Sequence, residues 1–480
     1  SRMDETGAQA PLEEPDDAIE RWVSLWSCGA LPEEPIVQYL EQWHERFWLF
    51  HPTRPFGQSQ TAQQGTQCSA AKLIGELSES GNKLRLFPSR TGEGKNGISY
   101  AEAARWLLYL NGFDDAALKP HIPKEQREGK IALAWLGQLG FVYAKGKNLF
   151  ETLLLNLVLL RPDHSLWGEN CPAWERETPR SEELRVIPLP DNQAELLTLQ
   201  SRLIWLNREG ETVTGYGILC GDSFDPKDTF AEQMTAWKKV EKKNTPVYYE
   251  PRPHEPGRQM WRDFSNIFMP APRAAGFNQV PGVVRWVAAL QRNHFLTKKR
   301  YMQFATVCNR YDSSQKSAVT DVLGDALTMQ TALLDELGVP WQKRIAEEIA
   351  KCDAVAQEIG ILAGRIFIAG GGDSEEEKQV RRAAQEKWYE RIDEPFRRWL
   401  YAIDPETDTV DGERLTEWIT AARRLALQLG QEYMEHAGTN ALFGRKIVDK
   451  NGKKQLYAAP RAYSWFRKRA YEIYQGSDEK

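Results

Sequence analysis

Eight apolar side chains between residues 341 and 366 recur at intervals of three or four. They are Trp341, Ile345, Ile349, Cys352, Val355, Ile359, Leu362 and Ile366. Because an α-helix has 3.6 residues per turn, this spacing places all of them on one face of a long helix. Such a face is stable in water only when other elements cover it, so the pattern predicts a set of packed helices.

Three further amphipathic segments follow this helix. The first should begin with a capping box formed by Ser374 and Glu377. Its apolar face contains Val380, Trp388, Ile392, Phe396, Trp399 and Leu400. A third helix should start near Asp411, and a basic loop should separate it from a fourth helix, APRAYSWFRKRAYEIY. Four amphipathic helices with short connections predict a four-helix bundle over residues 336–480.

Residues 1–335 mix helix and strand signals with long irregular segments. Two short helices are expected within residues 16–45, and Pro52 and Pro55 then favour an extended turn. Three β-branched and aromatic runs between residues 184 and 220 are typical of strands, and the glycines 137, 140 and 146 suggest a hairpin. The predicted fold class is therefore α+β. A mixed N-terminal domain (1–335), with short antiparallel strands and long loops, precedes the four-helix bundle (336–480).

Composition narrows the class of protein. Of the 480 residues, 41% are hydrophobic and 27% are charged, which is typical of a folded globular protein. No apolar run is long enough to span a membrane, and the first residues lack the plan of a signal peptide. The six cysteines are scattered without a CxxC pair, which argues against a zinc ribbon or a disulfide framework. We therefore expect a cytoplasmic protein with free thiols.

The sequence contains no recognisable catalytic constellation. The seven histidines include no HExxH motif, and no P-loop or GxSxG motif is present, so neither catalytic residues nor cofactors are predicted. Asp222, Asp225 and Asp228 are spaced three apart and could bind Mg²⁺. A turn rich in Asp, Ser and Pro has the same composition for local reasons. A Mg²⁺-dependent phosphoester hydrolase therefore remains an alternative.

Basic residues gather in three places, although the formal net charge is -5. The first cluster is Lys238, Lys239, Lys242 and Lys243, and the second is Lys298, Lys299 and Arg300. The third is Arg445, Lys446, Lys450, Lys453, Lys454, Arg461, Arg467, Lys468 and Arg469. The net charge argues against a free-standing nucleic-acid binder, but uneven clusters favour a partner that carries phosphates. A bundle that binds only protein, as a scaffold, is the other alternative.

Three segments, in their order along the chain, resemble a known family. RFWLFHPTRPFGQ, KNLFETLLLNLV and NRYDSSQKS are similar to segments of CasA, the large subunit of the Cascade surveillance complex of type I-E CRISPR systems. The resemblance runs roughly from residue 16 to the end. It implies a non-enzymatic protein that works with a guide RNA and other Cascade subunits. Such a protein reads the protospacer-adjacent motif of duplex DNA, starts strand separation and offers a docking surface to a helicase-nuclease.

The resemblance also implies roles for individual residues. Gln315 in NRYDSSQKS corresponds to a wedge that displaces a base pair, and Gly137 to a glycine that approaches the motif closely. The minor-groove lysine corresponds to Lys238 or Lys239, and the sequence does not choose between them. Phe87 matches an aromatic residue at the guide-contacting loop, which covers residues 88–97. Separating a stacked base step costs on the order of 1–2 kcal/mol, which a flat amide inserted beside the motif can partly offset.

The chain departs from the family in two respects. It opens with SRMDETGAQAPLEEPDD where relatives have a strand-forming segment, so either a segment precedes these residues or this branch differs. Some relatives carry clustered cysteines near the guide-contacting loop. This chain has none there, and no metal is expected.

Overall fold

The computed structural model describes most of the chain. The described residues are 2–3, 9–10, 12–79, 84–117, 119–120, 133–177, 186–269, 280–296, 301–311, 319–448 and 454–475. The chain divides into two compact units. The N-terminal unit comprises Ser1–Pro256, Ala271–Trp286 and Ala305–Asp325, and the helical unit comprises Gly257–Pro270, Val287–Phe304 and Ala326–Lys480. The predicted domain boundary after residue 335 stays a prediction.

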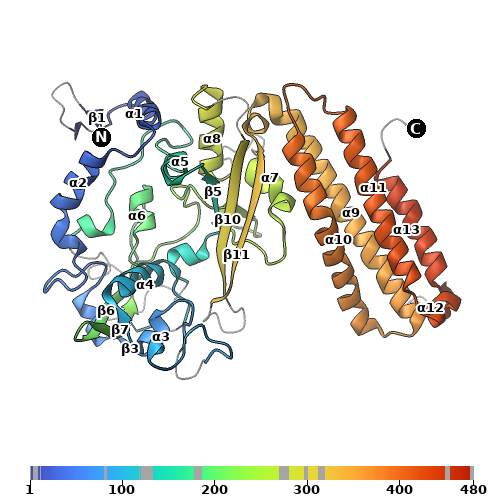
Figure 1. Cartoon of the computed structure of the whole chain (residues 1–480), viewed down its shortest axis with the longest axis horizontal. Coiled ribbons are helices and arrows are strands. Elements are labelled where there is room, and N and C mark those ends of the chain that lie inside the picture. The colour runs from blue at the N-terminus through green and yellow to red at the C-terminus, as the bar shows by residue number, and fades with distance from the viewer. Residues whose placement is uncertain are drawn as a thin grey trace. The chain divides into compact units, whose positions relative to one another are not determined.

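Four long helices dominate the helical unit (Figure 1). They are α9 (Val339–Gly370), α10 (Ser374–Ala402), α11 (Glu413–Glu435) and α13 (Ala459–Ile473). Helix α9 packs against α10 and α13, and α11 packs against the same two helices. This arrangement confirms the predicted C-terminal four-helix bundle, and with the small antiparallel sheets described below it confirms the α+β class.

Aromatic side chains fill the interior of the helical unit. Trp388 is fully buried, and its indole N–H donates to the Cys352 carbonyl at 2.9 Å. Trp399 and Trp418 stack with ring centroids 5.0 Å apart. Trp261, from the short helix η7 (Met260–Asp263), stacks on Phe396. The side chains that the apolar periodicity selected therefore do form the core of the bundle.

Two predicted details of the helical unit are wrong. The N-cap of α10 is Asp373, whose carboxylate accepts from the backbone N–H groups of Glu375 and Glu376, so Ser374 is already helical. The carboxylate can accept two N–H groups at once, which makes it the better cap. The predicted basic loop between α11 and α13 instead contains α12 (Thr439–Phe443) and an antiparallel pair, β12 (Arg445–Val448) with β13 (Lys454–Tyr457).

A small antiparallel sheet organises the N-terminal unit. Its central strand β7 (Thr212–Cys220) pairs with β3 (Thr66–Ser69), β4 (Ile98–Ser99) and β6 (Arg202–Glu209). Helices α3 (Ala70–Leu73) and α4 (Tyr100–Phe113) pack against β7. Two of the three predicted strands are thus β6 and β7. The third, near residue 186, is wrong, since the chain there makes only an isolated bridge from Val186 to Ser223.

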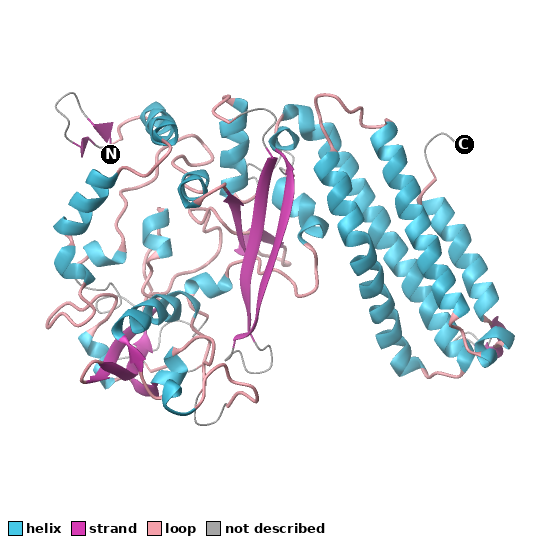
Figure 2. Ribbon diagram, viewed as in Figure 1, coloured by secondary structure: helices cyan, strands magenta, loops and turns pink. Residues whose placement is uncertain are grey.

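A second sheet contains the longest strands (Figure 2). Its order is β11 (Val319–Gln330), β10 (Tyr301–Tyr311) and β5 (Phe141–Lys145). The predicted hairpin around the glycines 137, 140 and 146 is wrong, because β5 pairs with β10 instead of with a neighbouring strand. Gly146 leads into the seven-residue helix α5 (Leu149–Leu155).

The remaining α-helices and strands are shorter than the helices of the bundle. The two helices predicted within residues 16–45 are confirmed as α1 (Pro15–Cys28) and α2 (Glu33–Gln42). The others are β1 (Arg2–Met3), β2 (Gln9–Ala10), α6 (Gln193–Leu197), β8 (Trp237–Val240), β9 (Tyr248–Pro251), α7 (Phe264–Phe268) and α8 (Gly282–Arg292). All six cysteines are free. Among the described residues, no helix has the length and apolar character needed to cross a bilayer.

Candidate nucleic-acid interface

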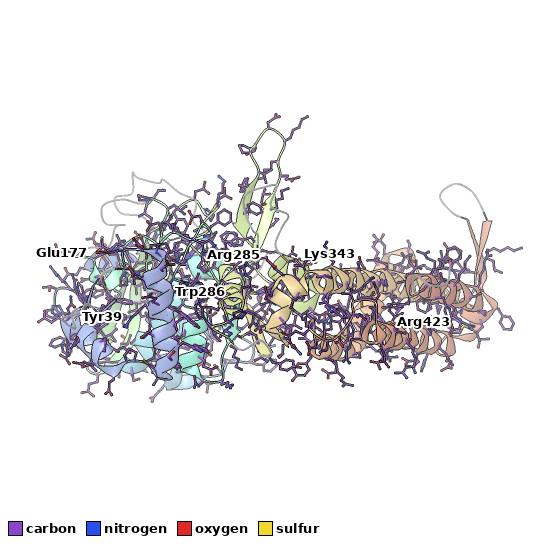
Figure 3. The ribbon with its side chains drawn as sticks, turned by 90° about the horizontal axis from the view of Figure 1, so that it is seen from above. Tyr39, Glu177, Arg285, Trp286, Lys343 and Arg423 are labelled. Carbon is purple, nitrogen blue, oxygen red and sulfur yellow. The ribbon has the colours of Figure 1, made fainter. Side chains whose placement is uncertain are left out.

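The two lysines predicted to meet DNA lie on a hairpin of the N-terminal unit. Lys238 and Lys239 are exposed residues of β8, opposite Glu250 and Tyr249 of the antiparallel strand β9. All of residues 241–247, at the tip, are exposed as well. Figure 3 shows this hairpin, in faint yellow-green, projecting from the body of the unit. Because neighbouring side chains of a strand point to opposite faces, the two lysines face opposite sides of the hairpin.

Buried aromatic residues hold the base of the hairpin. Trp237 is buried, and its ring lies 5.0 Å from that of Phe230. The Tyr249 N–H donates to the Asp228 carboxylate at 2.8 Å, and the Asp228 N–H donates back to the Tyr249 carbonyl at 2.9 Å. The lysines therefore stand on a backbone whose position is well determined by packing.

The lysines differ in their partners. Lys239 pairs with Glu241 at 2.5 Å, and the hydrogen bond that it donates to the Glu241 carboxylate raises the pKa of Lys239. Lys242 lies over the Tyr248 ring at 5.7 Å. Within the described part of the chain, the Lys238 ammonium makes no hydrogen bond or ion pair. Its charge is the most available of the three for an external phosphate or base.

Gly137 lies in the short helix η4 (Trp135–Gln138) and is buried. A Cβ atom at this position would overlap the hydroxyl of Tyr311, which donates to the Phe113 carbonyl at 2.7 Å. Glycine is thus needed here for packing inside the protein. Three residues further on, the Gly140 carbonyl accepts from the Ala236 N–H at 3.2 Å, next to β8. The segment from Gly137 to Gly140 therefore joins the end of β10 to the base of the lysine hairpin.

Gln315 lies outside the described residues, and the strands β10 and β11 on either side of its segment are described. Tyr311 ends β10 and Val319 begins β11. The Thr320 hydroxyl donates to the Arg310 carbonyl at 3.2 Å and bridges the two strands. Asn309 donates to the Tyr109 hydroxyl at 3.0 Å, which ties β10 to α4.

Phe87 is 89% exposed, and its neighbours Leu84 and Leu86 are exposed as well. Arg85, between the two leucines, donates to the Leu77 carbonyl at 2.6 Å and to the Val319 carbonyl at 3.1 Å. The segment with Phe87 is therefore tied to the first residue of β11. Together with the contacts of Gly137 and Gly140, this connects the segment of Phe87, the glycine segment, the lysine hairpin and the two strands that flank Gln315 within one unit.

Comparisons with known proteins show the family to which the chain belongs. A family model described as CRISPR-associated protein Cse1 matches residues 8–429. The chain belongs to the Cse1 family. The CasA/Cse1 protein of Thermus thermophilus is 28% identical over 441 residues, which are 89% of this chain and 81% of that protein. The predicted resemblance to CasA is confirmed.

Solved structures share the fold of this Cse1 family member. The crystal structure of Thermobifida fusca Cse1 matches with a TM-score of 0.78 and 28% identity, covering 95% of this chain and 88% of that one. A chain from a structure described as a CRISPR RNA-guided surveillance complex matches with a TM-score of 0.65 and covers 95% of this chain and 85% of that one. At 16% identity the second match shows likeness of fold alone.

The third basic cluster of this Cse1 family member differs from the hairpin, and the second cannot be compared with it. Lys298, Lys299 and Arg300 lie outside the described residues. In α13, Arg469 pairs with Glu358 at 3.0 Å and with Glu472 at 2.6 Å, and Lys468 lies 3.8 Å from Glu472. Part of the positive charge of the third cluster is therefore compensated within the protein.

Two of the three aspartates considered for Mg²⁺ have other partners in the structure. Asp225 pairs with Lys227 at 2.8 Å, and this hydrogen bond lowers the pKa of Asp225. Asp228 caps the Tyr249 N–H. Across the residues that the structure describes, no group of three histidines, cysteines or acids is arranged to hold a metal ion.

Sequence reasoning missed Arg85 and Tyr311, which join the predicted segments. Both act through single long-range hydrogen bonds, from Arg85 to Val319 and from Tyr311 to Phe113. No periodicity or motif marks such contacts. The only signal in the sequence is Arg85 itself, a charged residue that lies between two apolar leucines.

Proposed function

We propose that this chain is a non-catalytic subunit of an RNA-guided CRISPR surveillance complex. In that complex it recognises the protospacer-adjacent motif in duplex DNA, starts strand separation and helps to recruit a helicase-nuclease. Its partners are the guide RNA, the other subunits of the complex and the target duplex. Membership of the Cse1 family and the fold shared with a chain of a surveillance complex support the assembly.

The observation that carries the DNA-reading role is the set of three contacts between Gly137 and Tyr311, Gly140 and Ala236, and Arg85 and Val319. Through them the lysine hairpin, the glycine segment, the strands beside Gln315 and the segment of Phe87 form a connected group. Minor-groove readout needs this kind of arrangement, because the groove offers few distinguishing groups and depends on shape and close approach.

Each residue has a proposed role. Lys238 or Lys239 donates to an acceptor on the floor of the minor groove, and Lys238 is favoured because Glu241 already pairs with Lys239. Gly137 lets its segment pack tightly between the hairpin and β10, close to the motif. Gln315 intrudes beside the motif and displaces the first base pair. Phe87, with 89% of its surface in water, is covered by guide RNA or a neighbouring subunit.

A lysine substitution tests the DNA-reading role. In the assembled complex, Lys238→Ala should weaken binding to motif-bearing duplex by about tenfold, the expected loss for one good base contact. Lys243→Ala, an equal change of charge at the hairpin tip, should weaken binding by no more than about threefold. Binding would be measured by titration with duplexes that carry or lack the motif. Unchanged affinity in Lys238→Ala and in Lys239→Ala would refute the assignment.

A glutamine substitution tests the wedge. Gln315→Ala should slow formation of the open R-loop much more than it weakens the first binding to closed duplex. Ser314→Ala, in the same segment, is the matched control and should affect neither step. Strand opening would be followed with a fluorescent base analogue beside the motif. Equal losses in binding and in opening would contradict a wedge.

A further inference from the structure

The N-terminal unit contains a cavity that the proposed function does not use. Its volume is about 310 Å³, within the range of roughly 300–1,000 Å³ typical of small-molecule sites. The loop 53–61 borders it, together with the C-terminal half of α4 and the segments 173–177 and 197–200. Part of this wall is HPTRPFGQ, a segment that marks the family resemblance but has no assigned role.

Two arginines, Arg46 and Arg54, line this cavity and lie near enough to repel each other. The Arg46 guanidinium makes no hydrogen bond or ion pair with any residue that the structure describes. Arg54 has only a loose pairing with Glu177, at 3.7 Å, and 84% of the Glu177 side chain is exposed. Burial lowers the pKa of Arg46, and the nearby charge of Arg54 lowers it further. Two guanidinium groups that repel each other favour an anion between them, and phosphate matches their geometry.

An aromatic ring forms one wall and is held in place from behind. The Trp174 indole N–H donates to the Tyr39 hydroxyl at 2.7 Å, and Tyr39 donates to Glu175 at 2.5 Å. Burial raises the pKa of Tyr39 to about 12, so its hydroxyl keeps its proton for this bond. Tyr39 and Glu177 are labelled in Figure 3. A fixed, half-buried indole is a suitable surface on which a nucleobase can stack.

A polar atom without a partner marks the inner part of the cavity. Asn111 lines the cavity and is only 9% exposed, and its Oδ1 has no hydrogen-bond partner in the described structure. Its amide nitrogen donates to the Gly57 carbonyl over a long 3.4 Å. A buried acceptor without a donor is unfavourable, because it has lost its hydrogen bonds to water without gaining others. A ligand that brings an N–H group to this oxygen would supply such a bond.

The surroundings favour one phosphate over a strand of phosphates. A second cavity, of about 680 Å³, shares Arg46, Arg54 and Glu177 with the first. Three more glutamates line this second cavity, at positions 41, 45 and 175. Their charges would repel the consecutive phosphates of a nucleic-acid strand that passed over the mouth.

We propose that the first cavity binds a single nucleoside 5′-phosphate. Its phosphate lies between Arg46 and Arg54, its base stacks on Trp174, and an N–H group of the base donates to Asn111 Oδ1. Arg176 lines the same cavity but pairs with the buried Glu195 at 2.9 Å, so it shapes the wall and does not bind the phosphate. This site is independent of the DNA-reading role.

Calorimetric titration of the full-length chain tests the proposal with AMP as the probe. AMP should bind with a Kd of about 1 mM or lower, and ribose 5-phosphate and adenosine should each bind about tenfold more weakly. Equal binding of AMP and ribose 5-phosphate would refute recognition of the base. Binding of single-stranded oligoadenylate that AMP cannot displace would assign the site to a strand and overturn the proposal. Absence of AMP binding at about 5 mM would also overturn it.

Variants locate the site. Arg46→Gln combined with Arg54→Gln should reduce AMP affinity at least about tenfold. Lys145→Gln combined with Lys147→Gln removes the same charge from exposed positions away from the cavity, and AMP affinity should not change. Asn111→Leu should weaken AMP and leave ribose 5-phosphate unaffected. Since Asn111 is buried, the melting temperature of this variant is measured alongside. If the double variant at Arg46 and Arg54 and the double variant at Lys145 and Lys147 lose AMP binding equally, the site is refuted. This comparison does not depend on whether Asn111→Leu folds.

Discussion

The interiors of the two units differ in the charged side chains that they bury. In the helical unit, fully buried aromatic rings such as Trp388, Phe396 and Phe466 fill the space between helices. In the N-terminal unit, Asp114, Asp115, Lys119 and Arg202 are buried together. Both interiors are stabilised by removal of apolar surface from water. The N-terminal unit also buries a network of several matched charges, whereas in the helical unit the buried Glu348 pairs with Lys351.

The buried charges of the N-terminal unit are closely matched. Asp114 accepts from Arg202 at 2.5 Å and from Lys119 at 2.6 Å. Asp115 accepts from Lys119 at 2.8 Å and from Lys72 at 2.7 Å. Burial raises the pKa of Asp115, but the two lysines outweigh it, and the net shift is downward. Each charge is tolerated in the interior only because its partners are present, so removal of one should be severe.

The largest effect on stability is expected from Asp114→Asn. The amide cannot compensate Arg202 and Lys119, which leaves excess positive charge buried, at a cost of about 4 kcal/mol in the free energy of unfolding. Urea denaturation at neutral pH would measure this loss. Asp225→Asn is the matched control, since the Asp225–Lys227 pair is largely exposed, and it should cost less than about 1 kcal/mol. Similar losses in the two variants would mean that burial of the charge cluster does not matter.

A slightly smaller loss is expected in the helical unit from Trp388→Ala. This change leaves a cavity and removes the hydrogen bond from the indole to the Cys352 carbonyl, and should cost roughly 3–4 kcal/mol. Trp465→Ala, on α13, removes a ring that is 51% exposed and should cost about 1 kcal/mol or less. Urea denaturation at low and high salt separates this effect from that of Asp114→Asn. If apolar burial stabilises the bundle, the loss in Trp388→Ala is the same at both salt concentrations.

This contrast also explains what could be predicted from the sequence. Apolar residues on one face of a helix recur every three or four positions. Trp341, Ile345 and Ile349 therefore show in the sequence itself that they share one buried face. The sequence of a strand contains no comparable pattern that identifies the strand with which it pairs. The segment before Lys145 shows strand character, but nothing in it reveals that its partner is β10, more than 150 residues away. The hairpin predicted there failed because the nearest strand was assumed to be the partner.

The candidate site shows the same limit. Exposure of Lys238 and Lys239 follows from their type, and the structure agrees with it. The close packing of Gly137 against Tyr311 joins two segments that lie far apart along the chain, and only the fold reveals it. The charge cluster around Asp114 was also invisible, because Asp114, Lys119 and Arg202 are unremarkable as single residues. Long-range polar contacts leave almost no pattern in sequence.

Glu232 offers a finer test of the charged interior, because its carboxyl is buried and pairs with no cation among the residues that the structure describes. It is 3% exposed, and the Met234 N–H donates to its carboxyl at 2.8 Å. Burial raises its pKa from 4.5 to about 7, against a smaller opposing effect of the backbone hydrogen bonds. The folded chain therefore keeps this proton at pH values where the unfolded chain has lost it.

The sign of the pH dependence follows from this difference. Between about pH 4.5 and 7 the folded state holds more protons at Glu232 than the unfolded state, so stability falls as pH rises, by up to roughly 3 kcal/mol. Asp115 has a lowered pKa, so its contribution has the opposite sign and is lost only in stronger acid, below its unfolded value of 3.8. Glu232→Gln should therefore unfold at a higher urea concentration than the parent chain at pH 8, and the difference should shrink at pH 5. The same difference at both pH values would mean that Glu232 is ionised in the folded protein, and that this unit tolerates a buried charge without a partner.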